Sequence, residues 1–141
     1  RKQGADYGIN YSRADYVEEV LRITGGRGVD VSLNSVAGST LRRDPYAISP
    51  LGRLVIYGQA AGESVIDPYE VILPKSQTVS AFSVYTVLER DEYRRATDFL
   101  MNWLNTEELI SVTRTFPLED AAAAHRWIDE KKSAGKIALV I

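Results

Sequence analysis

Two short segments rich in glycine and small residues are the places where this sequence would let a ligand reach the backbone. The first, TGGRGVDVSLNSVAG (residues 24–38), holds four glycines in fifteen positions, and the second is YGQAAG (residues 57–62). Glycine-rich segments beside strands often hold phosphate groups, because their amides can approach an anion without hindrance from side chains. The elements on either side decide whether these segments do so.

The first part of the longer segment, TGGRG (residues 24–28), does not have the placement of a phosphate loop. A dinucleotide-binding glycine loop follows a strand and precedes a helix, so that its amides point at the pyrophosphate. Here the order is reversed, because TGGRG follows a helical pattern and precedes the strand pattern VDVSL. We therefore predict a helix stop and a tight turn. No GxGxxG motif occurs anywhere in the sequence.

The segments NSVAG (residues 34–38) and YGQAAG (residues 57–62) each lie just past the carboxyl end of an expected strand. In open α/β sheets, ligands bind at the carboxyl ends of the strands. Small residues there would let a flat ligand approach the backbone closely. The spacing alone leaves two interpretations open, ordinary turns or ligand contacts.

Few residue types that perform acid–base or metal chemistry are present. The sequence has one histidine, His125, and no cysteine, so we expect neither a disulfide nor a zinc site within it. His125 lies in the helical pattern AAAAHRWI, where we expect it to pack between elements rather than to act in catalysis. No nucleophile–base arrangement is visible, and the catalytic residues stay unknown at this stage.

The composition excludes several classes of protein. The chain has 141 residues, 45% of them hydrophobic, which is enough for one core. Its net charge is −2 and no basic stripe is visible, so we expect no nucleic-acid partner. No apolar run approaches ~20 residues and no signal peptide opens the chain, so we expect no membrane span and a cytoplasmic location.

Alternating strand and helix patterns predict an α/β fold. Strands are expected at residues 7–11, 29–33, 52–58, 78–84, 111–117 and 136–141. Helices are expected after a capping box from Ser12 to Asp15, over 39–48, as one turn near 67–73, and over 91–105 and 118–132.

Four stretches together resemble the medium-chain dehydrogenase/reductase superfamily, and within it the zinc-independent quinone oxidoreductases. They are GADYGINY (4–11), DYVEEVLRITGGRGVDVSLNSVAGSTL (15–41), GRLVIYGQAAG (52–62) and FPLEDAAAAHRWIDEKKSAGKIALVI (116–141). The resemblance covers nearly the whole chain. It implies a Rossmann-type domain that binds NADP(H), with strand order 3-2-1-4-5-6, and a separate GroES-like catalytic domain.

In the order of that family, the chain starts after the first two Rossmann strands, which carry the glycine fingerprint. The expected fold class is therefore α/β, the C-terminal portion of a Rossmann-type doubly wound parallel sheet that lacks the first two strands. Residues 1–110 would form a partial Rossmann nucleotide-binding domain. Residues 111–141 would form a C-terminal strand–helix–strand return segment that packs on the missing GroES-like domain. We expect this fragment to be inactive by itself and to bind the cofactor poorly.

The resemblance also implies cofactor contacts. Tyr11 matches a tyrosine near the adenosine 2′-phosphate, and most of the others match positions along the nicotinamide half. The full set is Tyr11, Ser35, Val36, Tyr57, Gly58, Gln59, Phe82, Ser83 and Lys136. Structural interpretations stand beside these, because the aromatic members could belong to a sheet edge or a core, and Lys136 could be a solvated charge.

The activity implied by the resemblance is hydride transfer from NADPH to a small-molecule quinone or enone. A homodimer through the edge strand at residues 78–84 is expected. The chain departs from the quinone reductases at Asn34 and Ala37, where they usually have Asp and Gly. The stretch LNSVAG is closer to the LNSLAG of polyketide and fatty-acid synthase enoyl reductases. An enoyl-thioester reductase and a non-catalytic nucleotide-binding module are therefore the alternatives.

Overall fold

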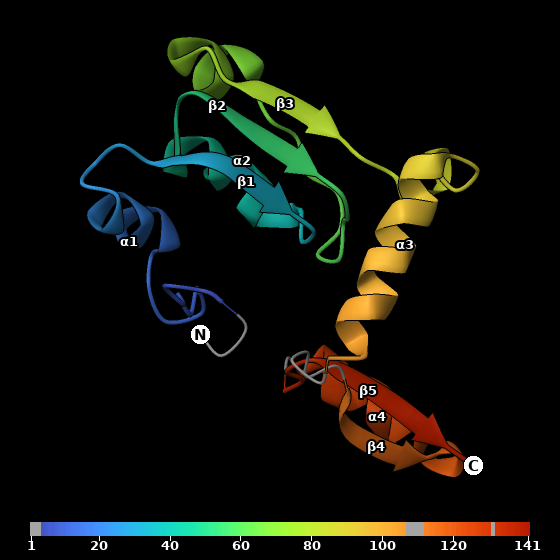
Figure 1. Ribbon diagram of the computed structural model, residues 1–141. Helices are drawn as coiled ribbons and strands as arrows, with labels where there is room; N and C mark the ends of the chain where they lie inside the picture. Colours follow the sequence, from blue (N-terminus) through green and yellow to red (C-terminus); the bar gives the residue numbers. More distant parts are fainter. Residues whose placement is uncertain (1–3, 107–111, 131) are drawn as a thin grey trace. The chain divides into compact units, whose positions relative to one another are not determined.

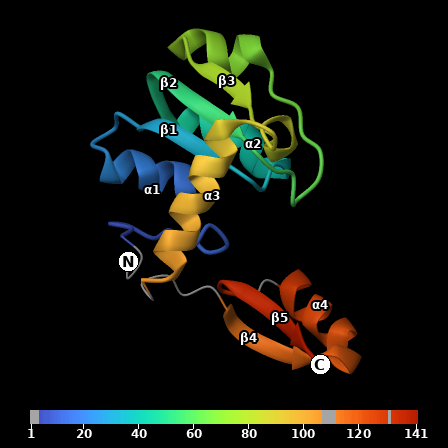
Figure 2. The ribbon, with the colours of Figure 1, turned by 45° about the vertical axis from the view of Figure 1, so that its right-hand side comes forward.

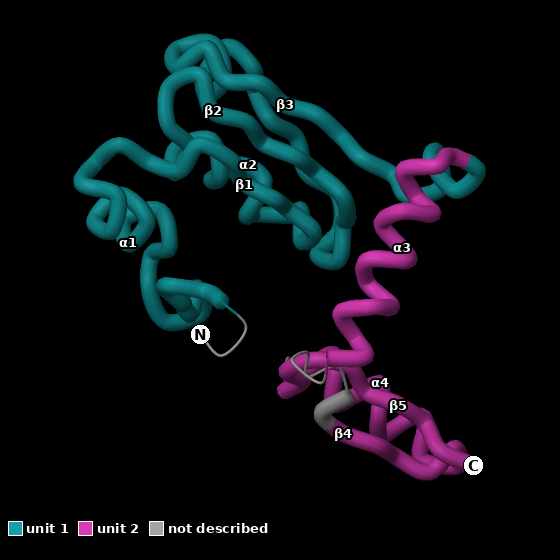
Figure 3. Tube along the Cα trace, viewed as in Figure 1, with its two compact units in different colours: residues 1, 3–89 teal, residues 2, 90–141 magenta. Residues whose placement is uncertain are grey.

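The structure is a computed structural model that describes residues 4–106, 112–130 and 132–141. The chain divides into two compact units between residues 89 and 90 (Figure 3). The predicted domain boundary between residues 110 and 111 lies outside the described residues, and the roles assigned to the two segments stay predictions. Both sheets in the structure are parallel and are flanked by helices, which confirms the predicted α/β class.

Unit 1 is built on a sheet of three parallel strands in the order β1 (Val29–Asn34), β2 (Ile48–Ile56) and β3 (Thr78–Ala81) (Figure 1). The strands are rich in β-branched and aliphatic residues, which fit a buried parallel sheet. Ser32 pairs with Leu54, and Leu54 pairs with Val79. The three strands are contiguous, as the resemblance to a Rossmann sheet predicts for its last three strands.

Two helices accompany this sheet, α1 (Tyr16–Ile23) and α2 (Gly38–Ala47). α2 connects β1 to β2 and lies against one face of the sheet, and α1 packs on α2 (Figures 1 and 2). Leu41 of α2 meets Ile48 and Leu54 of β2 in a small buried core. The sheet and α2 therefore form one layered unit that holds the carboxyl ends of β1 and β2 in place.

The predicted strand at residues 7–11 is wrong, because residues 7–10 form no regular element and a turn follows at residues 11–13. The Asn10 side chain accepts a hydrogen bond from the Ser12 amide at 3.0 Å, and the Asn10 carbonyl accepts the amides of Arg13 and Ala14. A strand needs a neighbour for its backbone groups, whereas Asn closes such turns locally.

The predicted capping box at Ser12 is also wrong, because α1 begins one turn later. The N-cap is Asp15, whose carboxylate accepts hydrogen bonds from the amides of Val17 and Glu18. Asp15 also forms an ion pair with Arg43 of α2. The hydrogen bond from Arg43 lowers the pKa of Asp15, so the cap carries its charge at neutral pH.

Two connections follow β2 and β3. The predicted turn near residues 67–73 is present as a π-helical turn, η1 (Pro68–Ile72), and a 3₁₀ turn, η2 (Leu73–Lys75). β3 ends at Ala81 rather than at residue 84, because Phe82 donates the last hydrogen bond to Ile56, where β2 itself ends. Residues beyond Phe82 have no strand partner there and form the 3₁₀ turn η3 (Val84–Thr86).

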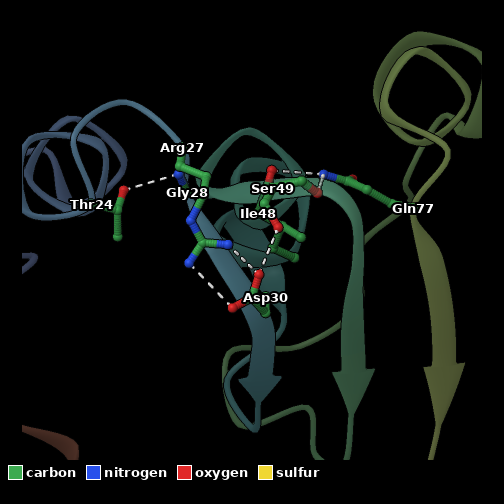
Figure 4. A network of polar contacts seen from close by, with 7 residues as sticks. All are labelled: Thr24, Arg27, Gly28, Asp30, Ile48, Ser49 and Gln77. Carbon is green, nitrogen blue, oxygen red and sulfur yellow. Dashed lines mark hydrogen bonds and ion pairs between the residues drawn. The ribbon is translucent and has the colours of Figure 1, made fainter.

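The amino ends of the strands are tied together by polar contacts around the TGGRG turn (Figure 4). The Gly28 amide donates to the Thr24 hydroxyl at 2.9 Å, and Asp30 accepts hydrogen bonds from Arg27 and Ser49. The Cβ of a residue larger than glycine at position 28 would lie 2.6 Å from the Ala47 carbonyl oxygen. The prediction that TGGRG is a structural turn is therefore confirmed.

Unit 2 begins with α3 (Asp91–Leu104) and continues with a strand–helix–strand segment. Its elements are β4 (Val112–Pro117), the 3₁₀ turn η4 (Leu118–Asp120), α4 (Ala121–Asp129) and β5 (Lys136–Val140). β4 and β5 pair in parallel. α4 ends at Asp129, earlier than predicted, with Glu130 as its C-cap.

One aromatic cluster organises unit 2. The Arg114 guanidinium of β4 lies 3.8 Å from the centroid of the Trp127 ring of α4, and 4.9 Å from that of Phe116. The cation therefore fastens α4 to β4. His125 on the same helix is exposed, so the prediction that it packs between elements is wrong. The buried residue of α4 is Ala124, and Trp127 is half-buried.

Candidate functional site

Two turns at the carboxyl ends of β1 and β2 interlock. We call residues 34–38 and 57–62 the strand-end turns. Four backbone hydrogen bonds join them: Tyr57 to Asn34 at 2.9 Å, Ala60 to Ser35 at 3.3 Å, Ala61 to Val36 at 2.7 Å and Gly38 to Gly62 at 3.2 Å. The turns are therefore one structure made from two distant pieces of sequence.

The glycines of these turns allow the two backbones to meet. A Cβ at position 58 would lie 2.6 Å from the Ser35 carbonyl oxygen, and one at position 38 would lie 2.9 Å from that of Ala61. Gly38 also has a φ of +56°, which side chains other than glycine rarely adopt. The glycines are therefore needed for the turns themselves. This supports the first of the two interpretations that the sequence left open, ordinary turns, and it leaves ligand contact untested.

Asn34, the last residue of β1, is buried beneath the first turn. Its carbonyl oxygen Oδ1 accepts the amides of Val36 at 2.9 Å and Ala37 at 2.7 Å. Its Nδ2 group donates to the Thr40 hydroxyl at 3.0 Å and to the Asp44 carboxylate at 2.6 Å. One side chain therefore links the turn to helix α2.

Asp44 is 7% exposed and accepts hydrogen bonds from three side chains of two elements, α1 and β1. Besides Asn34, it accepts the Tyr16 hydroxyl of α1 at 2.7 Å and the Ser32 hydroxyl of β1 at 3.3 Å. Burial raises the pKa of the Tyr16 phenol, and the Asp44 carboxylate raises it further. Tyr16 therefore stays protonated near neutral pH and remains a donor to Asp44.

Two cavities flank the strand-end turns. One of about 190 Å³ is lined by Tyr11, Tyr16, residues 32–36, Thr40 and Asp44. The other, of about 250 Å³, is lined by Ala37, Leu41, Ile56, Gly58, Gln59 and residues 62–65. Pockets for whole small ligands measure ~300 Å³ or more. Each cavity is thus smaller than a pocket that takes a whole small ligand.

Larger hollows of unit 1 lie away from the strand ends. One of about 490 Å³ is lined by α2 residues and by residues 65–67, 70 and 71, and another of about 500 Å³ is lined within residues 68–77. The first carries cationic and anionic side chains together, among them Arg42 and Glu70. This mixture selects no single ligand charge, so size alone does not make it the better candidate.

The predicted contact residues fall into three groups. Tyr11, Ser35 and Val36 line the smaller cavity, whereas Gly58 and Gln59 line the second.

Tyr57 is exposed at the end of β2, and Phe82 and Ser83 follow β3, where the Phe82 amide bonds to Ile56 at 2.8 Å. Lys136 begins β5 in unit 2. Contact of these residues with a cofactor stays a prediction.

The sequence interpretation missed Tyr16, Thr40 and Asp44 as members of the site. Thr40 and Asp44 lie one turn apart on α2, but so do many polar helix residues, and no pattern singled them out. Asn34 offered a usable signal, because Asn after a strand commonly bonds to the backbone of the following turn.

Parallel strands joined by helices are typical of the open α/β class of folds, in which ligands bind at the carboxyl ends of the strands. Within that class, this chain belongs to the zinc-binding dehydrogenase family, whose model matches residues 3–139. This confirms the predicted place in the medium-chain dehydrogenase/reductase superfamily. Among the described residues, no three His, Cys, Asp or Glu side chains are grouped so as to hold a metal ion.

Two of the similar relatives are enzymes of different kinds. The 2-haloacrylate reductase of a Burkholderia species is 36% identical over 146 residues, which cover 99% of this chain and 43% of that protein. The highly reducing polyketide synthase dmxL2 of Cryptosporiopsis sp. (strain 8999) is 33% identical over 143 residues, 95% of this chain and 6% of the synthase. The chain thus spans less than half of each of these relatives.

A solved structure shares the fold. Escherichia coli quinone oxidoreductase complexed with NADPH superposes with a TM-score of 0.82 at 26% identity, over 94% of this chain and 42% of that one. This likeness confirms the Rossmann-type fold class. In the part of the chain that the structure describes, no helix is long and apolar enough to cross a membrane.

Proposed function

We propose that this chain is part of an NAD(P)H-dependent oxidoreductase, with NADPH as the cofactor and a quinone or enone as the substrate. The observation that carries the proposal is the pair of interlocked strand-end turns at the sheet edge where this fold class binds nucleotides. The relative that is named a 2-haloacrylate reductase and the quinone oxidoreductase complexed with NADPH support it.

Bound NADPH would supply the hydride, and the protein would supply position. Ser35 and Val36 would lie beside the nicotinamide-side ribose, and residues 57–59 would line the nicotinamide half together with Phe82 and Ser83. The two flanking cavities, of about 190 and 250 Å³, fit such partial contacts. Tyr11 would lie near the adenosine 2′-phosphate, and Lys136 would also contact the cofactor.

The second candidate is reduction of an enoyl thioester. It is favoured by the stretch LNSVAG and by the similarity to a highly reducing polyketide synthase. A nucleotide-binding module without catalysis is the third. We also propose that the enzyme works without zinc, forms a homodimer through β3 and is cytoplasmic.

The test is a titration of NADPH, followed by nicotinamide fluorescence, with NADH in parallel. It is run on this chain and on the longer protein of which we propose it is a part. We expect saturable binding of NADPH by the longer protein and weak binding by the chain, because no glycine fingerprint is present to hold the pyrophosphate. Absence of saturable binding by the longer protein would overturn the proposal.

A matched pair of variants ties any binding to the strand-end turns. Gly58→Ala forces a Cβ against the Ser35 carbonyl, whereas Gly8→Ala places one in open space, and neither glycine has a positive φ. We expect the first to weaken NADPH binding by about tenfold or more and the second to leave it within about twofold. Assays of NADPH oxidation with a quinone, an enone and an enoyl thioester then separate the substrate classes.

A further inference from the structure

We propose that Asn34 is a positioning residue for the first strand-end turn. Because the Asn34 side-chain amide donates to Asp44, a carboxylate at position 34 could not take its place. The part of this inference that concerns the cofactor rests on the proposed function. The part that concerns the turn rests on this chain alone.

The Asn34 side chain faces partners of opposite kind at its two ends. Oδ1 accepts two backbone amides, those of Val36 and Ala37, and Nδ2 donates to Thr40 and Asp44. A carboxylate at this position could still accept the amides. It could not donate, and it would bring a second acidic group against Asp44, from which Nδ2 is 2.6 Å away.

The turn needs this support because of Ala37. Its φ of +57° lies in the left-handed region that residues other than glycine avoid. Ala37 also precedes α2 at the N-cap position without a side chain that could cap the helix. The hydrogen bond from its amide to Asn34, at 2.7 Å, holds Ala37 in this conformation.

The same contacts determine what the turn can offer a ligand. The amides of Val36 and Ala37 are taken by Asn34, and the carbonyls of Ser35 and Val36 accept Ala60 and Ala61. The backbone here is therefore not a phosphate cradle. Ser35 and Val36 line the cavity of about 190 Å³, and they bring a hydroxyl and an aliphatic side chain to this edge of the sheet. These suit an uncharged, hydroxyl-bearing group such as a ribose.

The test swaps the side-chain amide of Asn34 and the carboxylate of Asp44. Asn34→Asp, Asp44→Asn and the double variant are compared by amide hydrogen exchange at Val36, Ala37, Ala60 and Ala61. Asn34→Asp should speed exchange at these amides by about tenfold or more, because the turn opens locally. In the double variant, Asn at position 44 can donate to Asp at position 34 and accept from Tyr16, so protection should return toward the original value.

The matched control is Asn102→Asp on exposed α3, which should leave exchange in the strand-end turns unchanged. Two results would overturn the inference: unchanged exchange in Asn34→Asp, or a double variant no better protected than Asn34→Asp. If Asn34→Asp does not fold, recovery of folding in the double variant supports the inference, and failure to recover contradicts it.

NADPH affinity in the longer protein separates this inference from the proposed function. We expect Asn34→Asp to weaken NADPH binding by about tenfold and the double variant to restore most of it. Rescue of the exchange pattern in a protein that never binds NADPH would refute the proposed function and leave the turn assignment intact. A disturbed turn with undiminished NADPH binding would refute the cofactor part alone.

Discussion

The two faces of the β1-β2-β3 sheet differ in how much of a leucine side chain they leave exposed. Leu54 of β2 points toward α2 and is 0% exposed, whereas Leu33 of β1 points to the other face and is 67% exposed. Neighbouring positions along a strand alternate between faces, and Leu33 pairs with Val55, the residue after Leu54. One sheet thus has a packed face and an open face, on which Val31 and Leu33 are exposed beside polar residues such as Arg53.

This difference separates the interactions that hold unit 1 together from the surface that no element of unit 1 covers. The packed face joins the Leu41, Ile48 and Leu54 core to the polar contacts of Asp44. Parallel sheets in general have both faces covered. Exposure of Val31 and Leu33 is therefore what we expect of a sheet whose remaining layer comes from elsewhere.

The largest effect is expected from truncation on the packed face. Leu54→Ala should lower the free energy of unfolding by about 2–5 kcal/mol, because it leaves a cavity in the core. Leu33→Ala, the matched change on the open face, should stay within about 0.5 kcal/mol. Urea unfolding followed by circular dichroism measures both. Equal effects would mean that the two faces do not differ in packing.

A second pair of variants tests the close approach of Gly28 to the end of α2. Gly28→Ala drives a Cβ to 2.6 Å from the Ala47 carbonyl at the end of α2, whereas Gly26→Ala meets nothing within 4 Å. Both glycines have a φ of +84°, so the difference between the two variants isolates the contact. We expect Gly28→Ala to cost about 1–3 kcal/mol more. The midpoints of thermal unfolding of the two variants measure this difference, and equal midpoints would contradict the close approach of Gly28 to Ala47.

The open face can be tested through association. Leu33→Lys places a charge on the open face, so any association between copies of the chain that uses this face should weaken. Association through this face would be separate from the proposed dimer through β3, so in sedimentation velocity we expect species larger than the dimer to decrease, with the free energy of unfolding within about 0.5 kcal/mol of the original. Tyr69→Lys at an exposed position serves as the control, and an equal decrease of the larger species there would show that the open face does not mediate association.

The smallest effect concerns acid. Because Arg43 lowers the pKa of Asp15 in the folded chain, Asp15 stabilises α1 above the ordinary aspartate pKa near 3.9, and this stabilisation is lost as the pH falls through the lower folded value. Asp15→Asn keeps an acceptor for the cap but not the charge. The midpoint of thermal unfolding should therefore fall less steeply below about pH 4 in this variant than in the original chain. Parallel curves would contradict the assignment.

Most helices and strands could be predicted from the sequence, whereas the polar contacts of the site could not. The runs VDVSL and GRLVIYG predicted β1 and β2 because β-branched and aliphatic residues fit buried strands. The pattern at residues 7–11 failed, since Asn10 satisfies the backbone locally where no strand partner is at hand.

The contacts of Asp44 depend on how α1, β1 and α2 meet in space. Tyr16, Asn34 and Asp44 are brought together from positions up to 28 residues apart, and no local pattern encodes that meeting. The turns after β1 and β2 were recognised from their small residues, but their mutual hydrogen bonds were not.

The four hydrogen bonds between the strand-end turns have a consequence for engineering the chain. Neither turn is an independent module, because each supplies the partners that shape the other. Transplanting one of them from a relative, or lengthening it by a residue, would leave the other folded against a mismatched template. A change of ligand preference at this edge therefore requires the two turns to be exchanged as a matched set, together with the glycines that let them touch.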